Sequence, residues 1–197
     1  MPQLKITKIA PVAIMLIIIA IIIATVVSIV RLAVNDNSNI STDVQVNSLL
    51  DSSAERSVSM TVRGNIVADE NYRTYRIEIS PNSRVLSKTE GYLGKTTVLE
   101  TLPNNIPAYE QLVYALNKAN YMKGVELTGD KNDLRGVCAT GTLYSFEILN
   151  GEKPEKMLWT STCSGAKGSL SASLSQVYNL FMVQIPDFNE LTDGLWQ

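Results

Sequence analysis

Apolar residues follow two patterns in this chain: one continuous run near the start, and periodic spacing after it. Residues 9–30 contain no charged side chain. A helix over these residues would span roughly 33 Å, which suffices for a hydrocarbon core of about 30 Å. We therefore predict a transmembrane helix at 9–30. Lys5 and Lys8 precede the run, so the positive-inside rule places residues 1–8 in the cytoplasm and the remainder outside.

A cleaved signal peptide is the main alternative for this run. Signal peptides have an apolar core of about 7 to 15 residues and small residues before the cleavage site. The run at 9–30 is longer, and Arg31 would occupy the −3 position if cleavage followed Ala33. Type IV pilins share this layout, but their Gly-Phe processing site and early helix Glu are absent. We expect the run to be retained as an anchor.

Residues 31–56 are rich in Ser, Asn and Asp and have no regular apolar period. This composition predicts a flexible stalk between the anchor and a folded domain at 57–197. The short patch at residues 44–50 is compatible either with a brief helix or with packing on the membrane side.

Alternation of apolar and polar residues predicts strands in the folded domain. Over residues 73–80, for example, Tyr75, Ile77 and Ile79 lie on one side of an extended chain. The expected strands begin at Ser57 and cover residues 73–80, 84–89, 96–101, 142–149 and 155–163.

Helical spacing appears twice. After the turn signal Asn105-Ile106-Pro107, one helix places Tyr109, Leu112, Val113, Leu116 and Ala119 on one face. A second helix is expected over Leu170–Ile185, and its apolar face contains Leu174, Val177, Tyr178, Phe181 and Ile185.

This order of elements predicts an α+β domain of two layers, an antiparallel sheet with two helices on one face. Tyr144, Phe146 and Ile148 repeat the pattern of the strand at 73–80, and a helix follows both regions. A duplicated hairpin-plus-helix unit, related by an approximate twofold, would explain the repeat, and so would a generic strand and helix pattern. The predicted core consists of Tyr75, Ile77, Leu112, Leu116, Phe146, Ile148, Trp159, Val177 and Phe181.

Charge excludes one class of partner. Three of the 17 Lys and Arg residues precede Leu32, whereas all 19 Asp and Glu residues follow it, so the outer part is acidic. Binding to phosphates needs concentrated positive charge, and no basic cluster is present. We expect no nucleic-acid partner.

The two cysteines, Cys138 and Cys163, predict a disulfide. An even cysteine count outside the cytoplasm favours pairing. The midpoint between them falls on the turn signal Asn150-Gly151, so a hairpin would bring the two residues close to cross-strand register.

The chain has no histidine, so it lacks the commonest general base and cannot form a Ser-His-Asp or Cys-His site. Residues 91–97, GYLGKTT, lack the glycine spacing of a phosphate loop, and Ser164–Lys167 matches Ser-x-x-Lys without its partner motifs. Asp69-Glu70 and Asp130–Asp133 lack the order of a calcium-binding EF-hand loop and indicate solvated turns. We predict no catalytic, cofactor or metal site.

Glu78 and Glu147 occupy equivalent outward positions in two of the expected strands. An acidic pair on an exposed sheet face would suit contact with a partner, and it would equally suit the solvated side of an ordinary sheet.

Several segments resemble uncharacterised single-pass, membrane-anchored proteins of candidate-phyla-radiation bacteria of the Saccharibacteria type. They are residues 62–64, 66–70, 75, 108–111, 136–141 and 158–163. The similarity covers the anchor and the outer domain. It implies a location in a bacterial envelope and implies no role for any residue.

These features together predict a non-enzymatic binding or assembly module, anchored in the membrane and exposed to an envelope protein, surface protein or glycan. The alternatives are a cell-wall hydrolase that works through carboxylates and a structural subunit of the pilin type.

Overall fold

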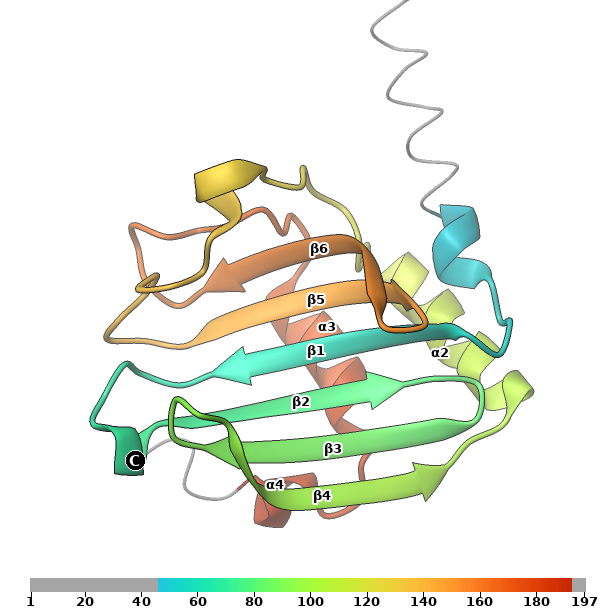
Figure 1. Ribbon diagram of the computed structural model, residues 1–197. Helices are drawn as coiled ribbons and strands as arrows, with labels where there is room; N and C mark the ends of the chain where they lie inside the picture. The colour runs from blue at the N-terminus through green and yellow to red at the C-terminus, as the bar shows by residue number, and fades with distance from the viewer. Residues whose placement is uncertain (1–45, 193–197) are drawn as a thin grey trace, which may run out of the picture. The chain divides into compact units, whose positions relative to one another are not determined.

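The alternating segments build one antiparallel sheet of six strands, in the order β4-β3-β2-β1-β5-β6 (Figure 1). The structure is a computed structural model, and residues 46–192 are described. The strands are β1 (Arg56–Arg63), β2 (Arg73–Ile79), β3 (Ser83–Glu90), β4 (Lys95–Pro103), β5 (Leu143–Asn150) and β6 (Lys153–Ser161). Each predicted strand is therefore present, with ends that differ by a few residues.

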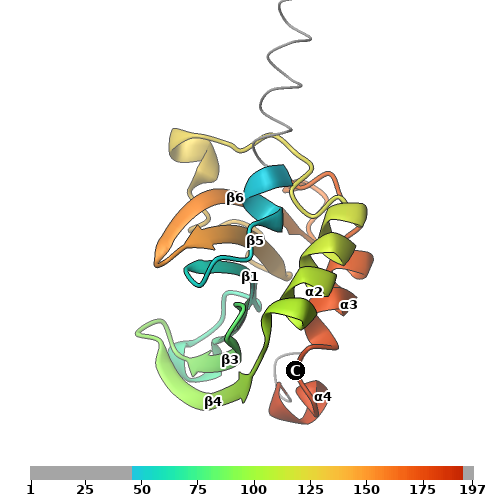
Figure 2. The same cartoon turned by 90° about the vertical axis from the view of Figure 1, so that its right-hand side faces the viewer.

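Two main helices cover one face of this sheet, as the side view in Figure 2 shows. They are α2 (Ile106–Lys118) and α3 (Leu174–Met182). The α+β class with an antiparallel sheet is confirmed. Shorter helical segments are η2 (Asp69–Asn71), η3 (Gly129–Asn132) and α4 (Phe188–Leu191), and residues 46–50 are also helical.

The ends of the two main helices have local causes. At the start of α2 the Asn105 side chain accepts a hydrogen bond from the Ala108 N–H, which is the ordinary N-cap arrangement. The second helix is shorter than the predicted Leu170–Ile185. Leu170 instead forms an isolated bridge with Gly124, so the chain is extended there and α3 begins at Leu174.

The hydrophobic core lies between the sheet and the helices. All predicted core residues except Trp159 belong to it. Trp159 is buried, but it lies on the other face of the sheet, because its partner on β5 is Ser145 and the core residue of that strand is Phe146. Period-two alternation then places Leu158 in the core and turns Trp159 away from it. The prediction for Trp159 as a core residue is wrong in this respect.

A twofold relation between two units, one of the two explanations for the sequence repeat, is incompatible with the sheet. Strands β2 and β5 both run antiparallel to β1, so they are parallel to each other, while β3 and β6 lie on opposite outer sides. A rotation that superposes these hairpins must turn the sheet over, which would place the helices on opposite faces. The two segments have similar patterns because both strands flank β1 in the same register: Tyr75 of β2 and Tyr144 of β5 both pair with Val62.

The described residues include the end of the expected stalk, and residues 46–50 there are helical. Leu49 is 2% exposed and belongs to the core cluster, so the end of the expected stalk packs on the domain. Within residues 46–192, no helix has the length and apolar character needed to cross a bilayer. The predicted span at 9–30 lies outside the described residues.

Candidate functional site

The sheet face opposite the helices carries a polar network centred on Arg76 of β2. The guanidinium donates to Glu147 Oε2 at 2.8 Å and to Glu78 Oε2 at 3.3 Å. It also donates to the Thr61 hydroxyl at 3.2 Å. The Glu147 side chain is 17% exposed and the Glu78 side chain is 39% exposed. One guanidinium therefore bridges both carboxylates that the sequence placed on the outer face.

The sheet register explains why the two glutamates meet. Ser59 of β1 pairs with Glu78 on one side and with Glu147 on the other. The Ser59 hydroxyl donates to Glu147 at 3.0 Å, and the Ser57 hydroxyl donates to Glu78, also at 3.0 Å. Each carboxylate thus accepts bonds from a serine and from Arg76. The two carboxylates therefore have the same kinds of hydrogen-bond partner.

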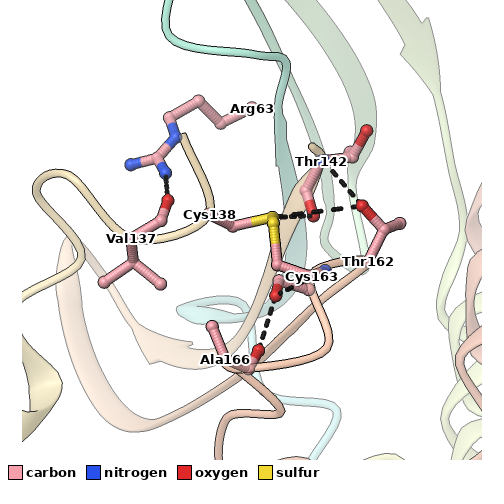
Figure 3. The surroundings of a disulfide bond; sticks show 8 residues. Arg63, Val137, Cys138, Thr142, Thr162, Cys163 and Ala166 are labelled. Atoms are coloured by element: carbon pink, nitrogen blue, oxygen red, sulfur yellow. Dashed lines mark hydrogen bonds between the residues drawn. A yellow bond between two sulfur atoms is a disulfide. The ribbon is translucent and has the colours of Figure 1, made fainter. Parts of the chain in front are cut away.

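A long loop between α2 and β5 lies along the β6 edge and reaches this face at the end of β1. Glu126 accepts a hydrogen bond from the Met157 N–H on β6 at 2.9 Å. Arg63 projects from the open face of β1 and donates to the Leu134 carbonyl at 2.7 Å and to the Val137 carbonyl (Figure 3). The loop therefore passes around the β6 edge onto the open face, where Arg63 holds it.

The Cys138–Cys163 disulfide fixes the end of this loop, as predicted, with a Cα–Cα distance of 5.5 Å (Figure 3). Cys138 precedes β5 and Cys163 follows β6, so the bond closes the open end of that hairpin. Gly141 lies against it, and a Cβ there would stand 2.9 Å from the Cys138 sulfur. The disulfide therefore requires a residue without a side chain at position 141, because a Cβ there would collide with the Cys138 sulfur.

The motifs that suggested chemistry occupy turns. Residues 91–94 form the β3–β4 hairpin turn, and β4 follows in place of the helix of a phosphate loop. Ser164–Lys167 lies in the loop after Cys163, where the Ala166 N–H donates to the Cys163 carbonyl. Within the described part of the chain, no group of three or more His, Cys, Asp or Glu could hold a metal ion.

The two acidic turns have structural partners. Asp69 accepts a hydrogen bond from the Tyr92 N–H at 2.7 Å. Asp133 accepts hydrogen bonds from the Arg135 guanidinium, whose Nε lies 2.9 Å from both carboxylate oxygens, and from the Arg135 backbone N–H at 3.0 Å. These hydrogen bonds lower the pKa of Asp133 to about 2. Both carboxylates therefore serve the local fold of their loops.

Four exposed apolar residues lie at the loop end of the sheet, two in the β1–β2 connection and two in the β3–β4 turn, and we call Ile66, Val67, Tyr92 and Leu93 the tip. These residues are exposed, and Leu93 is 98% exposed. Tyr92 stacks on Tyr72 with ring centroids 4.0 Å apart, and its hydroxyl donates to the Val67 carbonyl at 2.7 Å. The β3–β4 turn is therefore bonded to the β1–β2 connection, and Leu93 projects from a fixed support.

The tip lies at the end of β1 that is opposite the point where the chain enters the domain. Residues 46–50 stand near the start of β1, and the β1–β2 connection follows its other end (Figure 1). Sequence patterns did not indicate the tip, because its members belong to two separate turns. The position of Leu93 between Gly91 and Gly94 was the one available signal.

A shallow hollow of about 340 Å³ lies at the turn between α3 and α4. It is lined by residues between Met182 and Glu190, which form one short stretch of chain. Glu78 and Glu147 are not among its lining residues, so the expected acidic pair does not face this hollow.

Comparison of the chain with protein family models, with curated proteins and with solved structures finds no match.

Proposed function

We propose that the protein is a non-enzymatic binding module of a bacterial envelope, anchored by a transmembrane helix at residues 9–30. In this proposal the described domain stands on the outer side of the cytoplasmic membrane. The tip contacts a protein partner on the envelope or on another cell surface.

One observation carries the proposal: Leu93 is almost fully exposed although its supporting turn is tightly bonded. Single exposed apolar residues are ordinary on protein surfaces, but a group of neighbouring ones marks an interaction site. Ile66, Val67 and Tyr92 join Leu93 in such a group. Because the turn is already ordered by Asp69 and by the Tyr72 ring, binding would cost little additional conformational entropy.

The carboxylate arrangement favours binding over hydrolysis. A hydrolase of this type needs one carboxyl group that keeps a proton and a second that stays ionised. Glu78 and Glu147 instead share the Arg76 guanidinium, and each also accepts a hydrogen bond from a serine hydroxyl, so none of these contacts distinguishes one carboxyl group from the other. The aliphatic character of Leu93, Ile66 and Val67 favours a protein surface over a glycan.

Photo-crosslinking tests this proposal in the native cells. A benzophenone amino acid replaces Leu93 in the full chain, and the matched control carries it at Val183, which is 67% exposed on the helix side of the domain. We expect a discrete protein adduct in intact cells from the Leu93 position and none from Val183.

The same experiment separates the alternatives. Absence of an adduct at Leu93, or equal adducts from both positions, would overturn the tip as a binding site. An adduct that contains glycan and no protein would replace the proposed class of partner. A Leu93→Ser variant should weaken capture of the partner about tenfold, a loss of about 1.4 kcal/mol, as expected when one apolar contact is removed from a small interface.

A further inference from the structure

The two edges of the sheet differ in the state of their backbone groups. On β6 the outward N–H of Met157 donates to Glu126, and that of Trp159 donates to the Ser169 hydroxyl at 3.1 Å. The Trp159 carbonyl accepts from the N–H groups of Ser169 and Leu170, at 2.9 Å and 3.0 Å. Pro154 lies on the same strand. The outward N–H groups of Met157 and Trp159 and the Trp159 carbonyl are therefore satisfied by the chain itself.

The β4 edge presents a row of outward backbone groups. The Asn104 N–H donates to the Asn82 carbonyl, and Ser83 pairs with Pro103. Antiparallel ladders alternate between bonded and non-bonded pairs, so Leu102, Glu100 and Val98 bond to β3. The N–H and C=O groups of Leu99 and Thr101 consequently point away from the sheet. Pro103 also lies at an outward-facing position of β4, so its missing N–H removes no hydrogen bond to β3.

The side chains of β4 fit an open edge as well. Within the described residues, β4 is the last strand of the sheet on this side. Leu99 is 65% exposed and lies on the face opposite the helices. An edge strand with outward backbone groups and an exposed Leu is a template for a further strand.

We propose that β4 pairs antiparallel with β4 of a second copy of this chain, with Leu99 opposite Leu99 across a twofold axis. The axis is perpendicular to the sheet, since paired residues must lie on the same face. Two reciprocal hydrogen bonds join the Leu99 backbones, and the two sheets become continuous. This inference does not depend on the tip or its partner.

Charge and backbone chemistry select this register over its neighbours. Centring on Leu99 places Val98 opposite Glu100 of the second copy, so no like charges face each other. Centring on Glu100 would oppose two carboxylates directly, which is unfavourable. Centring on Thr101 would place Leu99 opposite Pro103, which has no N–H to donate. The register shift in the β3–β4 pair, between Lys88 and Thr89, ends regular pairing on the other side of Leu99.

Cysteine cross-linking tests the proposal with the full chain in detergent micelles and its native disulfide intact. A Leu99→Cys variant brings two thiols together, because bonded antiparallel pairs have a Cα–Cα distance of about 5.5 Å, which suits a disulfide. The matched control is Tyr114→Cys, which is 53% exposed on α2. We expect covalent dimers from Leu99→Cys to form about tenfold faster than from Tyr114→Cys.

A second measurement keeps the test independent of the new cysteine. Hydrogen exchange at the Leu99 and Thr101 amides of the unmodified chain should slow as protein concentration rises, and a Leu99→Lys variant should abolish that dependence. Equal cross-linking from both cysteine variants would overturn the proposal, as would exchange at Leu99 that is independent of concentration. A monomeric full chain by light scattering at concentrations of tens of micromolar would overturn it too.

Discussion

Tyr121 shows how a single polar group is accommodated inside the apolar layer. Its ring packs against Phe146 and Phe181, with centroid distances of 5.8 Å and 5.6 Å. Its hydroxyl lies 2.9 Å from the Ser59 carbonyl and 2.8 Å from the Glu147 carbonyl. These two residues form a pair between β1 and β5. Tyr121 therefore joins the helix layer to the centre of the sheet through one shared hydrogen-bond donor.

Burial raises the pKa of Tyr121 well above its ordinary value of 10.0. The unfolded chain therefore loses this proton at lower pH than the folded chain does. The contribution of the phenol to stability is fully present below pH 10 and is lost as the pH rises toward the folded pKa.

A Tyr121→Phe substitution should show this pH dependence. At neutral pH we expect it to cost about 1 kcal/mol of unfolding free energy, because the Ser59 and Glu147 carbonyls lose the Tyr121 hydroxyl as a hydrogen-bond donor. Both carbonyls keep their places in the sheet. Above pH 10 the wild-type advantage should fall by about 1.4 kcal/mol per pH unit, since Phe has no proton to lose. Urea unfolding of both proteins between pH 7 and pH 11 measures the difference, and a constant difference would contradict the assignment.

At the scale of elements, hairpins and helices follow from local patterns. The period-two segments became strands, and the Asn150-Gly151 turn lies between β5 and β6, with Gly151 at a φ of 60°. Because that turn fixes the register, the cysteines beyond the two strand ends meet. Local pattern failed at Leu170, where a contact with Gly124 keeps the chain extended.

Removal of the disulfide should loosen the loop end of the β5–β6 hairpin. The bond closes a sequence separation of 25 residues, which corresponds to about 3 kcal/mol in the chain-entropy model. A Cys138→Ala/Cys163→Ala variant should lose about this much unfolding free energy in urea. Dithiothreitol should destabilise the wild type to the same extent and leave the double variant unchanged. Equal stability of all three forms would show that Arg63 and the loop contacts suffice without the bond.

At the scale of the whole molecule, the domain boundary is set by burial. Leu49 contributes to the core, and Arg56 donates to Asp51 at 2.9 Å, so the segment before β1 is part of the folded unit. Its polar composition suggested a stalk because a single buried Leu between Ser, Asn and Asp residues leaves no period.

Two truncated chains test this boundary. A chain that begins at Val46 keeps the whole core cluster and should unfold with the stability of the intact domain. A chain that begins at Ser57 loses the burial of Leu49, which should cost about 3 kcal/mol. Leu49→Ala in the longer chain is the matched control and should reproduce most of that loss. Thermal unfolding by circular dichroism measures all three, and equal midpoints would place the boundary at Ser57 after all.

The sequence alone determined the local elements of the described domain, its fold class, the disulfide and most of the core, since each depends on periodicity or on a turn close in sequence. It also placed Glu78 and Glu147 on an outer face. Tertiary structure decided the order of the strands, the shared Arg76 partner, the burial of Leu49 and Tyr121, and the difference between the two sheet edges. Each of these depends on which segments that are distant in sequence become neighbours in space. The spacing of apolar residues is a local property and does not determine those contacts.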